Sequence, residues 1–181
     1  MSDARPSIPE LDLLKGFADR QSGPFAPGFE LFYPARREIT WFGPDPDRAR
    51  LDQLIPFATA GGPDSVYALW RCDDRAELGT LPVVFFGGDG DLSVDARGLR
   101  ELFELLTVIE DGDAGLVPAR REYLDWVRRT FGLTPPGDPA AIVRAAMLEY
   151  GPSFAEWVME FSPEELVDDL LDQLDTMAGK R

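Results

Sequence analysis

The sequence contains no histidine, and this absence excludes much of the catalytic chemistry that enzymes carry out near neutral pH. Histidine is the commonest general base in that pH range and the commonest zinc ligand. Ser-His-Asp and Cys-His catalysis are therefore excluded within this chain. An enzyme would need carboxylate, arginine, tyrosine or serine chemistry, and the sequence shows no recognisable arrangement of these residues. We accordingly predict no catalytic residue, no metal ligand and no cofactor.

Cysteine and long apolar runs are also scarce. The single cysteine, Cys72, has no partner within the chain for a disulfide and no second thiol for a zinc site. No apolar run approaches the roughly 18 residues that a membrane-spanning helix needs. Residues 1–15 lack the apolar middle of a signal peptide. We therefore expect a cytoplasmic protein that has no membrane as a partner.

Basic residues are outnumbered by acidic ones. The chain has 18 lysines and arginines against 33 aspartates and glutamates, which gives a formal net charge of −15. Such a charge repels the phosphates of nucleic acids and attracts basic proteins. We expect no nucleic acid as a partner, and we expect a basic protein.

The charge is unevenly distributed over the C-terminal third of the chain. Residues 116–147 contain five arginines and three acids, whereas residues 148–181 contain nine acids and two basic residues. Two interpretations are open. In the first, the arginine-rich and acidic helices lie near each other and offset their charges; in the second, the acidic helix binds a basic partner. The arginines of the first interpretation are Arg120, Arg121, Arg128 and Arg129.

Short strand candidates follow a predicted N-terminal helix at residues 9–20 and an ordered loop at residues 21–37. Clusters such as GPDPD, AGGPDS and GGDGD separate these candidates and are typical of turns. Spacing this tight indicates an antiparallel meander. The predicted strands are residues 38–42, 54–58, 65–71, 82–86 and 92–95.

Helical periodicity dominates after the strands. Residues 98–109 place leucines, Phe103 and Ile109 on one stripe, which is typical of a helix that faces a core. Further helices are predicted at residues 119–131, 139–150 and 163–177, with a short aromatic piece at 153–161. We therefore predict an α+β fold, in which helices back an antiparallel sheet of about four to six strands. The predicted units are an α+β domain at residues 1–115 and a helical C-terminal extension at residues 116–181.

The stretch LPVVFFGGDGD at residues 81–91 has three interpretations. A dinucleotide-binding loop needs a third glycine and a following helix, but Ser93 stands at that glycine position and a strand-like segment follows. A calcium loop that starts at Asp89 needs a glycine and a glutamate where the sequence has Val94 and Arg100. The related stretch at residues 110–122 also departs from the calcium pattern. A hairpin turn remains, in which glycine adopts positive φ and aspartate bonds its own backbone.

Three stretches follow one another over residues 54–107: LIPFATAGGPDSVYALWR, LPVVFFGGDGD and LSVDARGLRELFELL. They combine a strand before a glycine-containing turn, a strand ending at Trp70, a Pro-Val-Val strand, a Gly-acid-Gly-acid turn, another strand and a leucine-rich helix. This order resembles the core of the SUKH superfamily, which includes bacterial toxin-immunity proteins and fungal cell-wall-synthesis regulators. The resemblance implies a non-catalytic α+β scaffold at residues 1–115.

Several classes of function fit these features. The resemblance implies an immunity protein that neutralises a basic toxin by direct binding, and the negative charge agrees with such a partner. A regulatory or scaffold adaptor would show the same features. A carboxylate-based hydrolase is an alternative, although no pair stands out among the 33 acids. A structural subunit that assembles through the helical tail is a further alternative. We predict the binding protein.

The predicted partner-binding residues are all acidic. In SPEELVDDLLDQLDTM, residues 162–177, apolar side chains share one face of a predicted helix and carboxylates spread over the other. Like charges four residues apart cost a helix about 0.2–0.5 kcal/mol per pair, so a cationic group is expected to offset them. The predicted set is Asp168, Asp169, Asp172, Asp175, Asp89 and Asp91.

Overall fold

The strands form one antiparallel sheet in the order β1-β2-β3-β4-β5, so neighbours in the sequence are also neighbours in the sheet. A computed structural model describes residues 7–35, 37, 39–43, 47–62, 64–108, 117–160, 162 and 166–179. The predicted α+β class and the meander are confirmed. The strands are β1 (Phe29–Leu31), β2 (Leu54–Ala60), β3 (Val66–Trp70), β4 (Val83–Phe86) and β5 (Leu92–Ala96).

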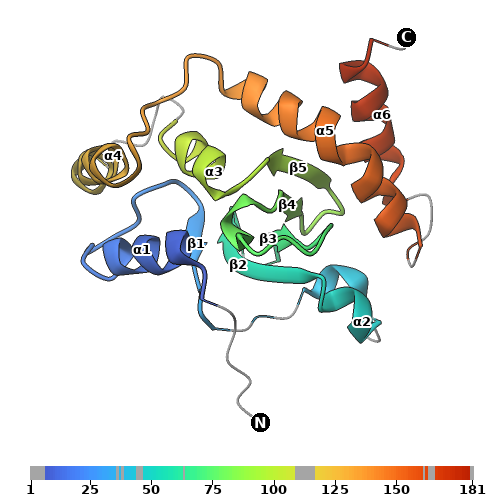
Figure 1. Cartoon of the computed structure of the whole chain (residues 1–181), viewed down its shortest axis with the longest axis horizontal. Coiled ribbons are helices and arrows are strands. Elements are labelled where there is room, and N and C mark those ends of the chain that lie inside the picture. Colours follow the sequence, from blue (N-terminus) through green and yellow to red (C-terminus); the bar gives the residue numbers. More distant parts are fainter. Residues whose placement is uncertain are drawn as a thin grey trace.

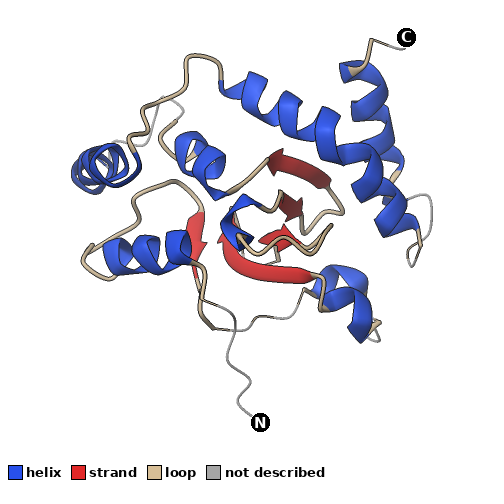
Figure 2. Cartoon of the chain, viewed as in Figure 1, coloured by secondary structure: helices blue, strands red, loops and turns tan. Residues whose placement is uncertain are grey.

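Helices cover both faces of this sheet. Figures 1 and 2 show the strands between α1, α3 and α4 on one side and α5 and α6 on the other. The segment after residue 116 therefore contributes to both helical layers. The α-helices are α1 (Pro9–Ala18), α2 (Arg48–Leu51), α3 (Leu99–Leu105), α4 (Val117–Phe131), α5 (Pro139–Met159) and α6 (Asp168–Met177), with 3-10 turns η1 (Thr40–Phe42) and η2 (Leu78–Thr80).

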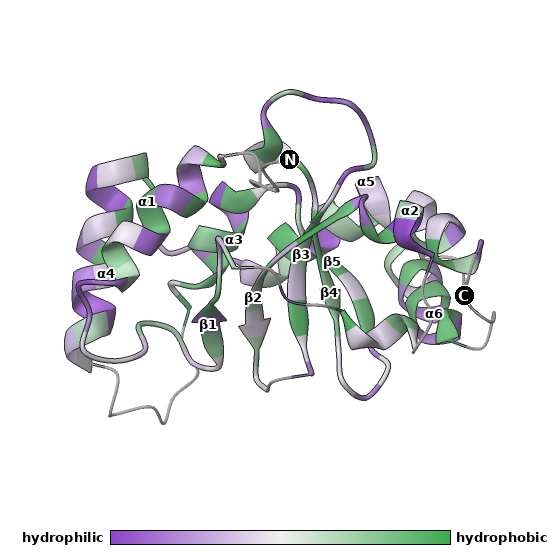
Figure 3. Ribbon diagram, turned by 90° about the horizontal axis from the view of Figure 1, so that it is seen from below, coloured by the Kyte–Doolittle hydropathy of each residue, from purple (hydrophilic) through white to green (hydrophobic). Residues whose placement is uncertain are grey.

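The central strands are apolar on both faces, because each face packs into its own hydrophobic core. Every residue of β2 from Leu54 to Thr59 is buried, and each strand from β2 to β5 contributes side chains to both cores. In β3, Leu69 packs into the first core, whereas Ala68 and Trp70 pack into the second. Figure 3 shows the resulting hydrophobic character of the central strands. Near-continuous apolar strands are what burial on both faces requires.

The first core is an aromatic cluster that joins α1 and α4. The ring centroids of Phe17 and Trp126 are 4.8 Å apart, and those of Phe25 and Tyr123 are 4.7 Å apart. The buried Tyr123 hydroxyl donates a 2.9 Å hydrogen bond to the carbonyl oxygen of Phe103 in α3. This bond gives the phenol a partner away from water, so α4 is tied to α3 as well.

The second core lies between the sheet and α5. Trp70 and Phe154 have ring centroids 5.3 Å apart, and Phe154 also contacts Phe86 at 5.9 Å. The Val94 amide of the edge strand β5 donates to the sulfur of Met147 at 3.2 Å. Covering an edge strand with a helix removes a surface on which another chain could pair.

Two predictions for residues 21–42 are wrong. The segment predicted as a strand at 38–42 contains the 3-10 turn η1, where Trp41 and Phe42 pack on Phe86 with centroid distances of 5.6 and 5.3 Å; residue 38 lies outside the described residues. The predicted loop contains β1, which is too short to show a periodic pattern. Its pairing with β2 begins at Phe29, opposite Ala60, and a Cβ added to the preceding Gly28 would lie 2.8 Å from the Gly61 nitrogen.

Predicted breaks in the helical region also differ from the structure. The helix at 139–150 and the aromatic piece at 153–161 form one helix, α5, which continues through Pro152. Proline removes one helical hydrogen bond, but buried residues on both sides of it, such as Met147 and Phe154, hold the two halves against the same sheet face. The predicted boundary at 115/116 and the predicted helix start at residue 163 lie outside the described residues.

We expect Leu102→Ala to lower the free energy of unfolding by about 2–5 kcal/mol, because it leaves a cavity under α3. Leu102 is 1% exposed, whereas Leu13 of α1 is 48% exposed. Urea unfolding should therefore separate Leu102→Ala from the control Leu13→Ala, which should lose less than about 1 kcal/mol. Equal losses in the two variants would contradict the packing of α3.

Candidate partner-binding surface

The apolar side of helix α6 packs on α5. Val167, Leu170 and Leu174 are buried in the second core. Gly151 permits the close approach, because a Cβ added there would lie 2.6 Å from Cδ2 of Leu174. Burial of this side fixes the rotation of α6, and its acidic residues therefore face solvent.

The four predicted acids of α6 are exposed: Asp168, Asp169, Asp172 and Asp175. Within the described residues, no hydrogen bond or ion pair reaches their carboxylates. The exposed carboxylate face predicted from the sequence is therefore present.

Asp89 and Asp91 lie in the hairpin turn between β4 and β5. The Gly87 amide donates to the Asp91 carbonyl oxygen at 2.8 Å, and the Gly90 amide donates to that of Gly87 at 3.0 Å. Gly90 has φ of 99°, which favours glycine at this position. The hairpin interpretation is confirmed, and both carboxylates are exposed.

A hollow of about 420 Å³ lies between this turn and the start of α6. Leu166, two residues before α6 begins, forms one wall, and Asp89 lies in another. Of the six predicted acids, Asp89 lines this hollow, whereas Asp91 and the four acids of α6 do not; Asp64 is the second acid in the lining. The lining residues are Thr40, Trp41, Asp64, Gly87, Gly88, Asp89, Gly90 and Leu166.

Trp41 and Asp64 were not predicted as site residues. Trp41 falls in the segment predicted as a strand, which gives no reason to place it beside Asp89. Asp64 lies in the AGGPDS stretch, whose resemblance to GGDGD is visible in the sequence. Only the pairing of β2, β3 and β4 shows that the two turns lie at the same end of the sheet.

The first interpretation of the uneven charge is wrong, because α4 and α6 lie at opposite ends of the molecule. Figures 1 and 3 both show this separation, and the two helices belong to different cores. Arg120 instead donates to the carbonyl oxygen of Thr107 at 2.9 Å, and Arg129 donates to that of Asp125 at 3.1 Å. Since charges are screened over about 8 Å at physiological salt, the arginines of α4 do not neutralise α6.

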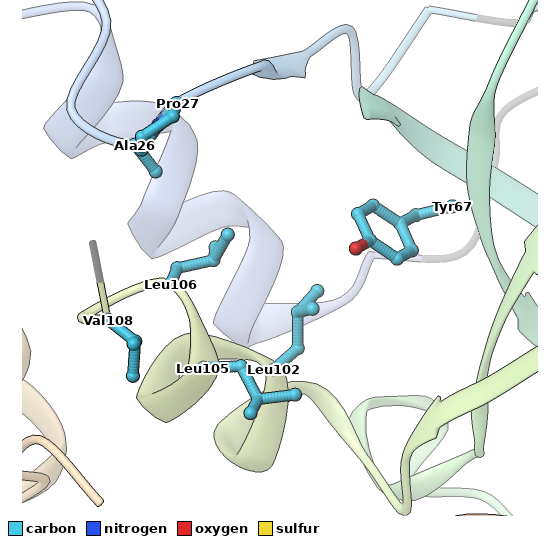
Figure 4. A pocket seen from close by; sticks show the side chains of 7 residues that line it. All are labelled: Ala26, Pro27, Tyr67, Leu102, Leu105, Leu106 and Val108. Atoms are coloured by element: carbon cyan, nitrogen blue, oxygen red, sulfur yellow. The ribbon is translucent and has the colours of Figure 1, made fainter. Parts of the chain in front are cut away.

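A second, mainly apolar cavity of about 290 Å³ lies under α3. Figure 4 shows the Tyr67 side chain pointing toward the leucines of α3 across this cavity. The lining residues are Ala26, Pro27, Tyr67, Leu102, Leu105, Leu106 and Val108. None of the predicted acidic residues lies here, so the two cavities are separate features.

Tyr67 belongs to a polar group on the same sheet face. The Ser93 hydroxyl donates to Asp95 Oδ1 at 2.5 Å. Burial raises the pKa of Asp95, and hydrogen bonds from Ser93 and Tyr67 partly offset this rise. Burial and the neighbouring Asp95 also raise the pKa of Tyr67. Protonation of Asp95 is thus coupled to folding.

In the described part of the chain, no group of three or more histidine, cysteine, aspartate or glutamate residues could hold a metal ion. Over the same residues, no helix has both the length and the hydropathy to cross a membrane.

Comparison with known proteins gives no identification. No family model matches the chain, and no curated protein or solved structure matches it.

We expect Asp95→Asn to change how stability depends on pH. Because the folded state holds its proton more tightly, the stability that Asp95 contributes is complete below its unfolded pKa of about 3.9 and is lost as pH rises through the folded pKa. The variant should therefore gain stability relative to the original protein as pH rises from about 4 to 8. Urea unfolding at several pH values measures this difference, with the exposed Asp175→Asn as control. A difference that does not change with pH would contradict the assignment.

Proposed function

We propose that this protein is a non-catalytic binding protein that uses its acidic surface to bind a basic protein, most concretely as an immunity protein that neutralises a toxin. The observation that carries the proposal is the exposed carboxylate face of α6, which has no cationic partner among the described residues. A protein that held these acids for its own stability would place basic side chains against them. Here the arginine-rich helix lies at the opposite end of the molecule.

The resemblance to the SUKH superfamily supports the immunity function in particular. It covers residues 54–107, which form β2, β3, β4, β5 and the helix α3. The order of four strands followed by a helix is the order that the resemblance implies. A regulatory adaptor of the same fold would use the same surface, so the identity of the partner decides between the two.

Charge and geometry also suit the capture of a basic partner. A net charge of −15 accelerates the encounter with a basic protein. The acids of α6 are mounted on a helix that is fixed by packing against α5, so little order needs to be gained on binding. Both features favour fast and specific association.

Neutralising Asp168, Asp169, Asp172 and Asp175 to Asn should slow association at least about tenfold and reduce its dependence on salt. The folded protein should be as stable as before or slightly more stable, because like charges four residues apart are removed. The measurement has two stages: affinity capture from source cells identifies the partner, and surface plasmon resonance with the purified partner gives the rates. Co-expression of the partner with this protein then tests whether toxicity is relieved.

A matched control removes the same charge elsewhere. Asp74, Glu77, Glu122 and Asp125 are exposed acids outside α6, and their change to Asn or Gln leaves the surface of α6 intact. This control should keep most of the association rate. An equal decrease of the association rate in both variants would show that only net charge matters. An unchanged association rate in the α6 variant would show that α6 is not part of the interface. A partner that has no toxicity when expressed alone would contradict the immunity function.

A further inference from the structure

The hollow beside Asp89 has one aromatic wall that is held in place by the core. Trp41 is half-buried, with ring centroids 5.1 Å from Phe42 and 5.6 Å from Phe86. These contacts fix the indole, while Trp41 also lines the hollow. An indole face fixed in this way attracts a cation that lies over it.

Two carboxylates from different turns place negative charge in the same hollow as the indole. Asp64 precedes β3, and Asp89 lies between β4 and β5. The turns are in contact, because the Gly88 amide donates to the Ser65 hydroxyl at 3.2 Å and a Cβ on Gly88 would lie 3.1 Å from Cβ of Asp64. Both carboxylates are exposed, and neither forms an ion pair with a described residue.

Leu166 completes the hollow with an apolar wall. Leu166 is 44% exposed, whereas the adjacent Val167 is buried. The hollow therefore combines an aromatic face, an apolar wall and two negative groups. A long side chain with an apolar stem and a positive end fits this combination.

We propose that the hollow receives one arginine side chain of the basic protein partner, an inference that rests on the proposed function. The guanidinium group stacks on Trp41 and donates hydrogen bonds to Asp64 and Asp89, while its methylene stem lies along Leu166. Arginine fits better than lysine, because its planar group can stack and bond to carboxylates at the same time. Charge complementarity identifies the occupant, since both ionisable groups of the hollow are acidic.

The probe is the peptide acetyl-Gly-Arg-Gly-amide, titrated into the full-length protein at low salt and followed by amide and indole NMR shifts. We expect saturable shifts at the indole of Trp41 and at the amides of Gly88 and Gly90. The same peptide with citrulline, which has the same shape without the charge, should bind at least about tenfold more weakly, because hydrogen bonds from a charged donor are the stronger ones.

Matched variants locate the binding. Asp64→Asn/Asp89→Asn should weaken the arginine peptide at least about tenfold, and Trp41→Phe, which keeps the packing on Phe86, should weaken it less. The control Glu122→Gln/Asp125→Asn removes the same charge from the exposed side of α4 and should leave binding within about twofold.

Equal binding of the citrulline peptide, or equal losses in the hollow and α4 variants, would overturn the arginine pocket. The outcome is separable from that of the proposed function. If the peptide binds in the hollow but the α6 variant captures its partner normally, the pocket stands and the α6 interface fails. If the peptide does not bind while partner capture depends on α6, the interface stands and the pocket fails.

Discussion

Burial of the sheet on both faces is the constraint on which the rest of the structure depends. Strands such as β2 and β3 expose almost no polar side chain on either face, so two separate helical layers must cover them. Helices α1, α3 and α4 supply one layer, and α5 supplies the other. Since burial contributes about 25 cal/mol per Å² of apolar surface, loss of either layer would expose a core that the sheet cannot shield alone.

This arrangement also explains where the acidic surface lies. Helix α5 occupies the second face of the sheet, so α6 packs mainly on α5, where Gly151 lets Leu174 approach. A helix in such an outer position buries a narrow stripe and exposes the rest. The carboxylates of α6 therefore occupy a rigid and solvent-facing surface, and Leu166 brings the start of this helix to the β4–β5 turn.

The charge distribution follows from the same topology. Helices α4 and α5 are consecutive in the sequence but cover opposite faces of the sheet, so the arginines of α4 and the acids of α6 are carried to opposite ends. The negative potential around α6 is therefore not cancelled by the arginines of α4, because salt screens charges at that separation. The proposed binding of a basic protein would use this field for steering.

Local patterns in the sequence determined the α+β class, four of the strands, the core-facing stripe of α3 and the glycine turn after β4. Turn chemistry and side-chain periodicity act over a few neighbouring residues, so they can be read from the sequence. They also determined which face of α6 would be charged. Only the tertiary structure decided that β1 joins the sheet, that α5 continues through Pro152 and that Trp41, Asp64 and Asp89 share one hollow. Each of these depends on contacts between segments distant in the sequence, and strand pairing and core packing override local preference there.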